Sequence, residues 1–205
     1  MPKIYYEKQI FPDWCELRQY HIFILKNDDE LFLKKYIYQK SLLFLCEGEI
    51  TFKISEENEK RIKKGDIIDM NEVGFLRNVS NQTSIIIVAT GNWTEITNSG
   101  IFTLDNTEFP RNIGDYTSYS RNTNFDNHFH DCDEYWIFYE GEGIAVSEGN
   151  FYKLQEGVCI ATKAGFHHDI PIIHQRLKGI YFETSLKGKK RTGHLWNHTH
   201  AYGEA

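Results

Sequence analysis

Short apolar runs, separated by turns of glycine, asparagine, aspartate and charged residues, dominate the hydropathy pattern of this chain. Within several runs, such as residues 50–54, apolar and polar positions alternate, and a period of two predicts β-strands with one buried face. The best helical candidate, residues 7–19, contains Pro12 and keeps no helical period. We expect strands at residues 20–25, 31–38, 42–46, 50–54, 67–68 and 84–89, and again at 135–139, 144–146, 150–154, 158–161 and 176–182.

The two halves of the chain repeat one plan. The stretch LFLCEGEITF around Gly48 resembles WIFYEGEGIAV, where Gly141 or Gly143 is the counterpart, and IKKGDIIDM around Gly65 resembles LQEGVCIAT around Gly157. A period of about 94 residues is too long for a solenoid and suits a duplicated β-domain. Antiparallel strands joined by tight turns must close or stack to hide their edges, which favours barrels or jelly rolls. We expect a barrel in residues 1–92, a polar connection with an entry strand in 93–124, a second barrel in 125–184 and a C-terminal arm in 185–205.

Composition and charge restrict the classes of partner. Hydrophobic residues make up 40% and aromatic residues 15% of the 205 positions, and the formal net charge is −6. No basic stripe is present, so we expect no nucleic-acid partner. The N-terminus has no pattern of a secretion signal, and no apolar run approaches the ~20 residues of a membrane helix, which predicts a cytoplasmic protein without a membrane partner. The four cysteines lack CxxC spacing and predict reduced, buried thiols.

The histidines place the candidate chemistry in the second half, because eight of the nine lie between residues 128 and 200. His128, His130 and Glu134 share parity, so on an extended strand all three would point to one face. Together with His168 they offer three imidazoles and one carboxylate. This set binds a divalent transition metal and leaves coordination positions free, and it suits Fe, Mn, Zn, Ni or Co without choosing among them.

The half from Phe125 to Thr184 resembles the cupin family. The first cupin signature is matched by His128, His130, Glu134 and Gly141, and the second by Gly157 followed by the stretch KAGFHH, which ends at His168. Two positions depart from the pattern, since Lys163 stands where proline is usual and Asn122 where glycine is usual. The resemblance implies an all-β fold of two tandem cupin-type jelly-roll barrels, with one metal inside the second barrel bound by His128, His130, Glu134 and His168.

Several alternatives stay open around these ligands. If the motif register slips by one residue, His167 replaces His168 as the ligand. Cys132 shares the parity of the ligands and is expected to be a thiol in the wall of the site. Carboxylates near the motif are candidates to orient the imidazole rings, although each also suits loop chemistry: Asp126, Asp131, Asp133 and Asp169. Four further histidines offer a second metal site or tail contacts: His174, His194, His198 and His200.

The first half resembles the same barrel without its chemistry. Lys34, Lys35, Tyr36 and Tyr38 stand where ligands should precede Gly48, and the position of the last histidine falls near residues 75–77. We therefore expect a metal-free N-terminal barrel that serves as a scaffold or a dimer surface. Because chains with two cupin barrels often pair through barrel edges, the resemblance implies a homodimer.

The residues around the motif predict the kind of chemistry. Glu134, Tyr139 and Glu183 are the candidate catalytic residues, while Arg121, Asn124 and Trp136 are the candidate substrate-binding residues. Arg121 suits a carboxylate or phosphate, and these residues together favour a small hydroxylated or anionic substrate.

Three functions of different classes are consistent with this site. The first is a metal-dependent isomerase, epimerase or lyase that acts on a small hydroxy-carbonyl compound such as a sugar or sugar acid. The second is a non-haem Fe(II) dioxygenase, and the third is a non-enzymatic cupin that binds a small molecule. The fold alone does not choose among them.

Overall fold

The computed structural model describes residues 3–33, 39–55, 58–70, 74–112 and 114–184, and within them it contains β-strands and no helix. The expected all-β jelly-roll fold class is confirmed. Within this described part, no helix has the length and apolar character that crossing a membrane requires. The arm at 185–205, its three histidines and the positions 34–38 lie outside the described residues.

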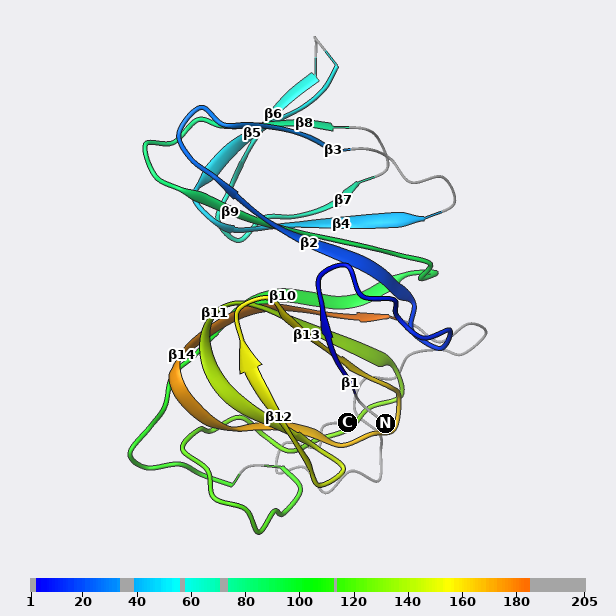
Figure 1. Ribbon diagram of the computed structural model, residues 1–205, viewed down its shortest axis with the longest axis vertical. Coiled ribbons are helices and arrows are strands. Elements are labelled where there is room, and N and C mark those ends of the chain that lie inside the picture. Colours follow the sequence, from blue (N-terminus) through cyan, green and yellow to red (C-terminus); the bar gives the residue numbers. More distant parts are fainter. Residues whose placement is uncertain (1–2, 34–38, 56–57, 71–73, 113, 185–205) are drawn as a thin grey trace. The chain divides into compact units, whose positions relative to one another are not determined.

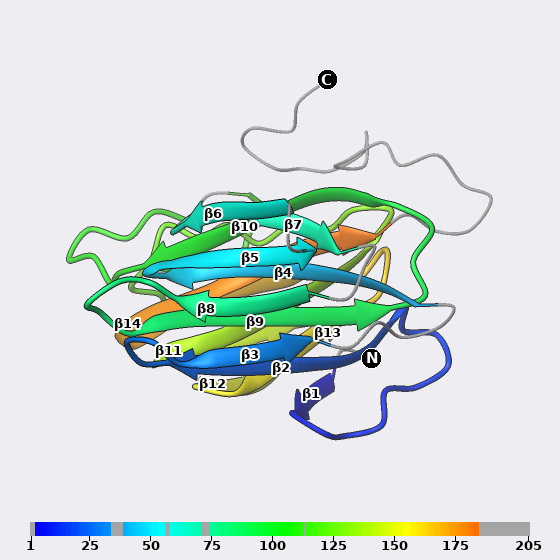
Figure 2. The same ribbon diagram turned by 90° about the horizontal axis from the view of Figure 1, so that it is seen from above.

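The chain forms two compact units, Glu7–Trp93 and a second unit made of strand β1 (Lys3–Tyr6) with residues 94–184. The first unit contains two four-stranded antiparallel sheets, and Figure 2 shows the strand axes of both sheets lying nearly parallel to one another. One sheet has the order β2 (Leu17–Leu25), β9 (Ser84–Gly91), β4 (Lys40–Glu47) and β7 (Ile67–Met70). The other has the order β3 (Glu30–Leu33), β8 (Gly74–Asn78), β5 (Glu49–Ser55) and β6 (Asn58–Lys63).

Apolar side chains fill the space between these two sheets. Every strand of the unit contributes to one buried cluster, whose members are Leu25, Leu33, Leu43, Leu45, Ile50, Phe52, Ile62, Met70, Leu76, Ile86 and Val88. Alternate residues of a strand point to the same face, so the period of two in the sequence supplies this core directly. The interior of the first barrel is thus a packed apolar core.

The second unit is one antiparallel sheet that bends along its two longest strands. Its order is β1, β13 (Val158–Thr162), β11 (Asp133–Ser147), β14 (His168–Thr184) and β10 (Ile96–Leu104), and β12 (Asn150–Gln155) pairs with β11. Figure 1 shows β11 and β14 curving side by side. The buried cluster of this unit draws on both halves of β11 and β14, from Trp136 and Phe138 to Ala145, and from Ile170 to Leu177.

Irregular pairing explains why β11 is one strand of 15 residues. The sequence predicted a turn at residues 140–143 between two strands, and this prediction is wrong. Gly141 takes a positive φ of 93°, and the register with β14 shifts at several points between Phe138 and Val146. Such bulges bend a strand without reversing it, so the glycines mark a bend here instead of a hairpin.

Equivalent turns in the two units support the internal duplication. The backbone amide of Gly65 donates to the carbonyl oxygen of Leu45 at 3.0 Å, and the amide of Gly157 donates to that of Phe138 at 2.9 Å. Gly48 and Gly141 follow these carbonyls at the same spacing, and both have positive φ. The structure therefore identifies Gly141, and not Gly143, as the counterpart of Gly48.

Two strands lie where the sequence showed no clear signal. Lys3–Tyr6 pairs with β13 of the second unit, although the expected boundary assigned residues 1–92 to one barrel. Ile96–Leu104 lies within the expected polar connection and pairs with β14 along its length. A four-residue strand is too short for a hydropathy pattern, and Ile96–Leu104 contains as many polar as large apolar residues and a glycine at its centre.

We expect alanine at Gly141 to destabilise the protein far more than alanine at Gly149. Both glycines have positive φ, but a Cβ at Gly141 would overlap the carbonyl oxygen of Arg176, whereas the space around Gly149 is open. The backbone conformation alone costs about 1 kcal/mol, and the overlap should bring the Gly141→Ala loss above about 3 kcal/mol. Urea unfolding measures both, and equal losses would contradict the role assigned to the bend.

Candidate metal centre

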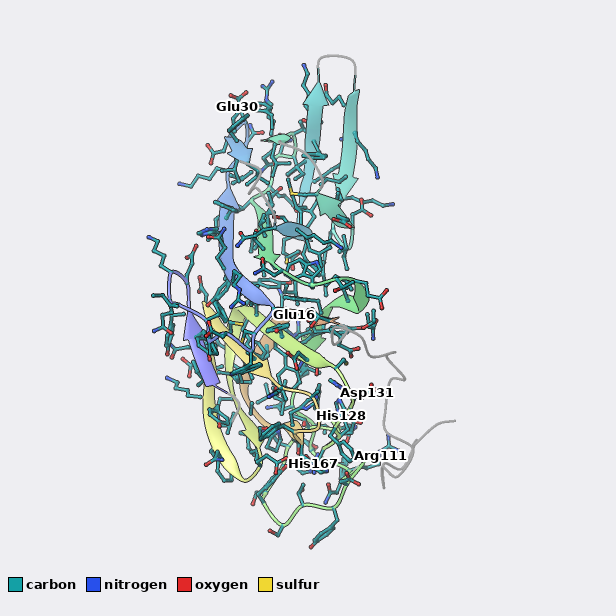
Figure 3. All side chains as sticks on the ribbon, turned by 90° about the vertical axis from the view of Figure 1, so that its right-hand side faces the viewer. Glu16, Glu30, Arg111, His128, Asp131 and His167 are labelled. Carbon is teal, nitrogen blue, oxygen red and sulfur yellow. The ribbon has the colours of Figure 1, made fainter. Side chains whose placement is uncertain are left out.

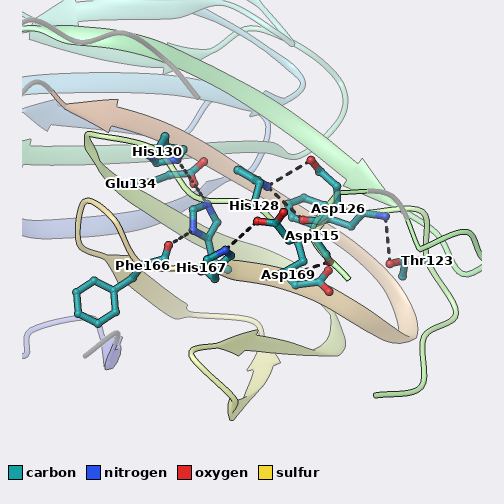
Figure 4. A network of polar contacts seen from close by, with 12 residues as sticks. Asp115, Thr123, Asp126, His128, His130, Glu134, Phe166, His167 and Asp169 are labelled. Carbon is teal, nitrogen blue, oxygen red and sulfur yellow. Dashed lines mark hydrogen bonds and ion pairs between the residues drawn. The ribbon is translucent and has the colours of Figure 1, made fainter. Parts of the chain in front are cut away.

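Four side chains converge inside the second unit. His128, His130, Glu134 and His168 each offer one ligand atom, and these four atoms all lie within 4.8 Å of one another. Glu134 connects the group, since its Oε2 lies 3.2 Å from Nε2 of His130 and 2.8 Å from Nε2 of His168. Figure 4 shows His128, His130 and Glu134 pointing toward one another. The structure thus brings together all four predicted ligands.

The path of the chain to this site differs from the expected strand. His128 and His130 precede β11 and lie on the long segment that joins β10 to β11. Figure 3 labels His128 on this segment. His128 pairs with His168 in an isolated bridge, in which the backbone amide of His168 donates to the carbonyl oxygen of His128 at 2.9 Å. The shared parity of residues 128, 130 and 134 therefore does not arise from one continuous strand. The bridge to β14 fixes the first histidine instead.

Backbone carbonyl groups orient all three imidazoles. In each ring, Nδ1 donates a hydrogen bond to a backbone carbonyl oxygen. The acceptor of His128 is Asp126 at 3.2 Å, the acceptor of His130 is Cys132 at 3.0 Å, and the acceptor of His168 is Phe166 at 2.9 Å. A carbonyl oxygen only accepts, so Nδ1 carries the proton in each ring and Nε2 is the nitrogen that a metal would bind. Hydrogen bonds to nearby main-chain carbonyl groups therefore orient the three imidazole rings.

The segment that carries the first two histidines is held against β14 by its own side chains. Thr123 Oγ1 donates to the carbonyl oxygen of Ile170 at 2.6 Å. The Asn122 side chain makes two hydrogen bonds to the backbone of Ile173, each 2.8 Å long. These bonds attach the segment to β14. They place His128 beside His168.

Burial and mutual contacts set the charges of the ligands. Burial raises the pKa of Glu134, but hydrogen bonds from His130 and His168 outweigh it and hold this pKa well below its usual range. Burial, and then the charge of His168, lower the pKa of His128. For His130, burial lowers the pKa, but contacts with Cys132 and Glu134 raise it to about 10. Without a metal, the site holds an ionised carboxylate beside a protonated imidazole.

A pocket of about 240 Å³ opens onto these ligands. It shares His128 and Glu134 with the cluster, and its other lining residues are Phe102, Leu104, Phe125, Asp126, Trp136, Tyr181 and Glu183. Glu134 and Glu183 are direct partners across β11 and β14, so both carboxylates lie on one face. Of the predicted catalytic and substrate-binding residues, Glu134, Glu183 and Trp136 line this pocket.

Arg121 serves a different purpose from the predicted one. Its guanidinium donates to Oδ2 of Asp169 at 2.6 Å and to the carbonyl oxygen of Phe125 at 2.6 Å. The side chain of Arg121 is only 7% exposed and that of Asp169 is fully buried. Tyr119 donates a further hydrogen bond to Asp169 at 2.7 Å. Arg121 therefore fixes the loop before His128 to β14 and does not line the metal pocket.

Two other predicted site residues also lie outside the pocket lining. Asn124 is exposed, and its side-chain oxygen accepts a hydrogen bond from the backbone amide of Arg111. Tyr139 is buried at the bulge that follows Phe138. The bulge was not visible in the sequence, so the position of Tyr139 relative to the site could not be inferred from parity.

The alternatives left open by the sequence are placed as follows. His167 lies between two carboxylates, with Nε2 2.8 Å from Asp115 and Nδ1 3.4 Å from Glu148, and the metal-ligand cluster contains His168 instead. Cys132 is buried in the wall of the site, with Sγ 3.1 Å from Nδ1 of His130. All four cysteines are buried and free of disulfides, as expected. His174 is exposed on β14, and its three expected companions lie outside the described residues.

Sequence reasoning missed the aromatic wall of the pocket. Phe102 and Leu104 come from β10, Phe125 from the loop before His128, and Tyr181 from β14. Phe125 packs edge-on against Trp136 with ring centroids 5.4 Å apart. The alternation of Phe102 and Leu104 with polar residues indicates the end of a strand. The polar residues before Phe102 gave no sign that this strand has nine residues.

Replacing the second of the two adjacent histidines should remove the metal, whereas replacing the first should not. We expect His168→Ala, His130→Ala and Glu134→Ala to lose most bound metal and to keep the fold, because the core of the unit is apolar. His167→Ala is the matched control and should keep its metal. Elemental analysis and circular dichroism of the purified variants measure both properties. Full metal retention in His168→Ala would refute the ligand set.

Metal uptake should release a proton and weaken as the pH falls. The raised pKa of His130 means that its imidazole is protonated near neutral pH, and a metal must displace that proton from Nε2. Each unit of decrease in pH then lowers the apparent affinity about tenfold. Titration calorimetry of Zn(II) in two buffers of different ionisation enthalpy counts the protons. Heats that do not depend on the buffer would contradict this expectation.

Comparisons with known proteins agree with this architecture. No family model matches the sequence. The uncharacterized protein y4oW of Sinorhizobium fredii is 36% identical over 193 residues, which cover 92% of this chain and 88% of that protein. Among solved structures, AerE from Microcystis aeruginosa has a TM-score of 0.57 at 12% identity and covers 83% of this chain and 91% of its own. Vicilin from Corylus avellana has a TM-score of 0.60 at 10% identity, and the match covers 93% of this chain and 82% of the vicilin chain. These structures show the fold, which is the cupin jelly roll, and the chain belongs to the same protein family as y4oW.

Proposed function

We propose that this protein is a metal-dependent cupin enzyme that moves a proton on a small hydroxy-carbonyl compound, as an isomerase, epimerase or lyase. The observation that supports the proposal is the position of Glu183. Glu183 on β14 is the direct pairing partner of the ligand Glu134 on the neighbouring strand β11. Its carboxylate lines the same pocket and is outside the ligand cluster. A base beside a metal position is the arrangement that proton transfer between neighbouring atoms needs.

The residues present fit a divalent transition metal. The four ligand atoms lie within 4.8 Å of one another, and the hydrogen bond at Nδ1 of each imidazole leaves its Nε2 to bind a metal beside the ionised carboxylate. His128, His130, Glu134 and His168 would hold Fe, Mn, Zn, Ni or Co. When bound, such an ion supplies Lewis acidity, which lowers the pKa of a C–H or O–H group next to a coordinated oxygen.

The protein's own residues would then handle the proton. Glu183 is 6% exposed, and the Cys132 thiol lies 3.9 Å from its Oε2. As a carboxylate it accepts a proton from the substrate on one side and returns it to a neighbouring atom. Trp136 and Phe125 close the wall on which the substrate rests and exclude water from its apolar face. Glu134 is used as a ligand, and Asp126 Oδ2 lies 3.5 Å from Nδ1 of the ligand His128. We therefore assign the role of base to Glu183, the third carboxylate of the pocket lining.

A non-haem Fe(II) dioxygenase is the second candidate. The aromatic lining of the pocket favours it, because a flat substrate can pack against Trp136, Phe125 and Tyr181 beside the metal position. The two candidates differ in what they consume. Proton transfer exchanges hydrogen with solvent and needs no oxygen, whereas a dioxygenase consumes oxygen in proportion to its Fe(II) content.

Replacing Glu183 should separate catalysis from metal binding. We expect Glu183→Gln to keep the metal but to lose at least about a hundredfold in the rate of substrate deuteration in D₂O. Tyr139→Phe is the control, because Tyr139 does not line the pocket. The assay uses a panel of sugars, sugar acids and hydroxyketones with metal-loaded protein. Oxygen uptake that depends on Fe(II), without solvent exchange, would overturn the first candidate and support the second.

A further inference from the structure

The wall of the metal pocket changes from polar to apolar along its strands. Glu134 on β11 pairs with Glu183 on β14, and Trp136 pairs with Tyr181 two residues further along these strands. Residues two apart on a strand point to the same face and lie ~6.6 Å from each other. All four of these residues line the pocket. The carboxylates therefore stand at the ligand cluster, and the aromatic rings stand one pair away from it.

Strand β10 extends the apolar part of this wall through two pairs of a glycine and an aromatic residue. Gly100 is the partner of Tyr181, and Phe102 is the partner of Gly179. Each ring lies over the glycine opposite it, since a Cβ at Gly100 would be 2.5 Å from Cε1 of Tyr181, and a Cβ at Gly179 would be 2.8 Å from Cζ of Phe102. A glycine in a strand permits such a close approach. The two missing side chains therefore give the rings the positions in which they line the pocket.

The protein covers the apolar side chains of this wall only in part. Phe102, Leu104, Phe125 and Tyr181 pack against the buried cluster of the second unit but are themselves half-buried. All four line the pocket. Removing such apolar surface from water is favourable, and pockets for small molecules are commonly lined in this way. The exposed part of the wall therefore fits an apolar group of a ligand.

The size of the pocket limits that group to about one ring. At about 30 Å³ for each water molecule, a volume of about 240 Å³ holds about eight waters, or a molecule of on the order of ten non-hydrogen atoms. A short hydroxy-carbonyl end joined to one ring meets this limit, whereas a nucleotide or a disaccharide exceeds it.

We infer that the substrate of this site carries one apolar ring next to its hydroxy-carbonyl end, and that Tyr181 and Phe102 determine this specificity. The inference rests on the proposed function, because it concerns the substrate of that same site. The oxygen atoms of the substrate lie at the ligand cluster, and its ring lies one pair further along the strands, against Tyr181, Phe102 and Trp136. Gly100 is a positioning residue, since it acts through the ring of Tyr181.

Three hydroxy acids test the inference on the zinc-loaded protein. Mandelate, lactate and glycerate share one chelating group and one charge, and they carry a phenyl, a methyl and a hydroxymethyl group in turn. We expect mandelate to bind at least about tenfold more tightly than either of the others, because only its ring covers the aromatic wall. Titration calorimetry measures the three dissociation constants. Mandelate that binds no more tightly than lactate or glycerate would overturn the inference.

Leucine at either ring position tests whether the preference comes from the wall. Tyr181→Leu and Phe102→Leu should each lower the preference for mandelate over lactate at least about threefold. Tyr152→Leu is the matched control, because Tyr152 is half-buried against the same cluster but lies outside the lining of this pocket. A preference that persists in both ring variants, or that falls equally in the control, would contradict the assignment.

Alanine at Gly100 tests the positioning role. Its Cβ should displace the ring of Tyr181 and lower the same preference at least about threefold, whereas Gly149→Ala, where the space is open, should leave the preference unchanged. A loss of folded protein lowers the fraction that titrates and not this ratio, so an altered ratio reports the position of the ring. An unchanged ratio in Gly100→Ala would overturn the positioning role. The deuteration assay is a separate measurement, and its failure beside an intact preference for mandelate would overturn the proposed function alone.

Discussion

The curvature of the paired strands β11 and β14 is the constraint on which the site depends. His168 begins β14 and Glu183 lies next to its end, and a straight strand would separate them by ~50 Å at ~3.3 Å per residue. Both nevertheless lie beside Glu134, His168 at 2.8 Å and Glu183 as its partner across the sheet. The register shifts between Phe138 and Val146 bend the sheet back on itself and close this distance.

The same framework in the first unit shows what the chemistry requires beyond the fold. Ser41 pairs with Thr90 and Met70 where Glu134 pairs with Glu183 and Thr162. The hydroxyl groups of Ser41 and Thr90 hydrogen-bond to each other at 2.8 Å. Counted from the matched turn glycines, Leu76 stands in the place of His168 and belongs to the aliphatic core. One barrel is filled with apolar side chains, and the other leaves room for polar ones.

The sequence predicted those features that depend on local spacing. The ligand set followed from motif spacing, and strands such as β4 and β9 followed from their apolar runs. Features that depend on partners distant in the chain were not predictable. Arg121 was assigned to substrate because nothing in the sequence indicates that Asp169 neutralises it, and strand β1 is defined only by its pairing with β13. The glycines at 141 and 143 showed that the chain changes direction without showing whether it turns or bends.

The main-chain acceptors behind the three imidazoles have a consequence for the divergence of this family. Many metal-binding histidines are oriented by a carboxylate side chain, which a single substitution can delete. Here every Nδ1 proton is received by a peptide oxygen, at residues 126, 132 and 166, and replacing those side chains leaves the oxygen in place. Substitutions at residues that contact a substrate can therefore change the specificity of the pocket, while the carbonyl oxygens that orient the imidazoles stay in place.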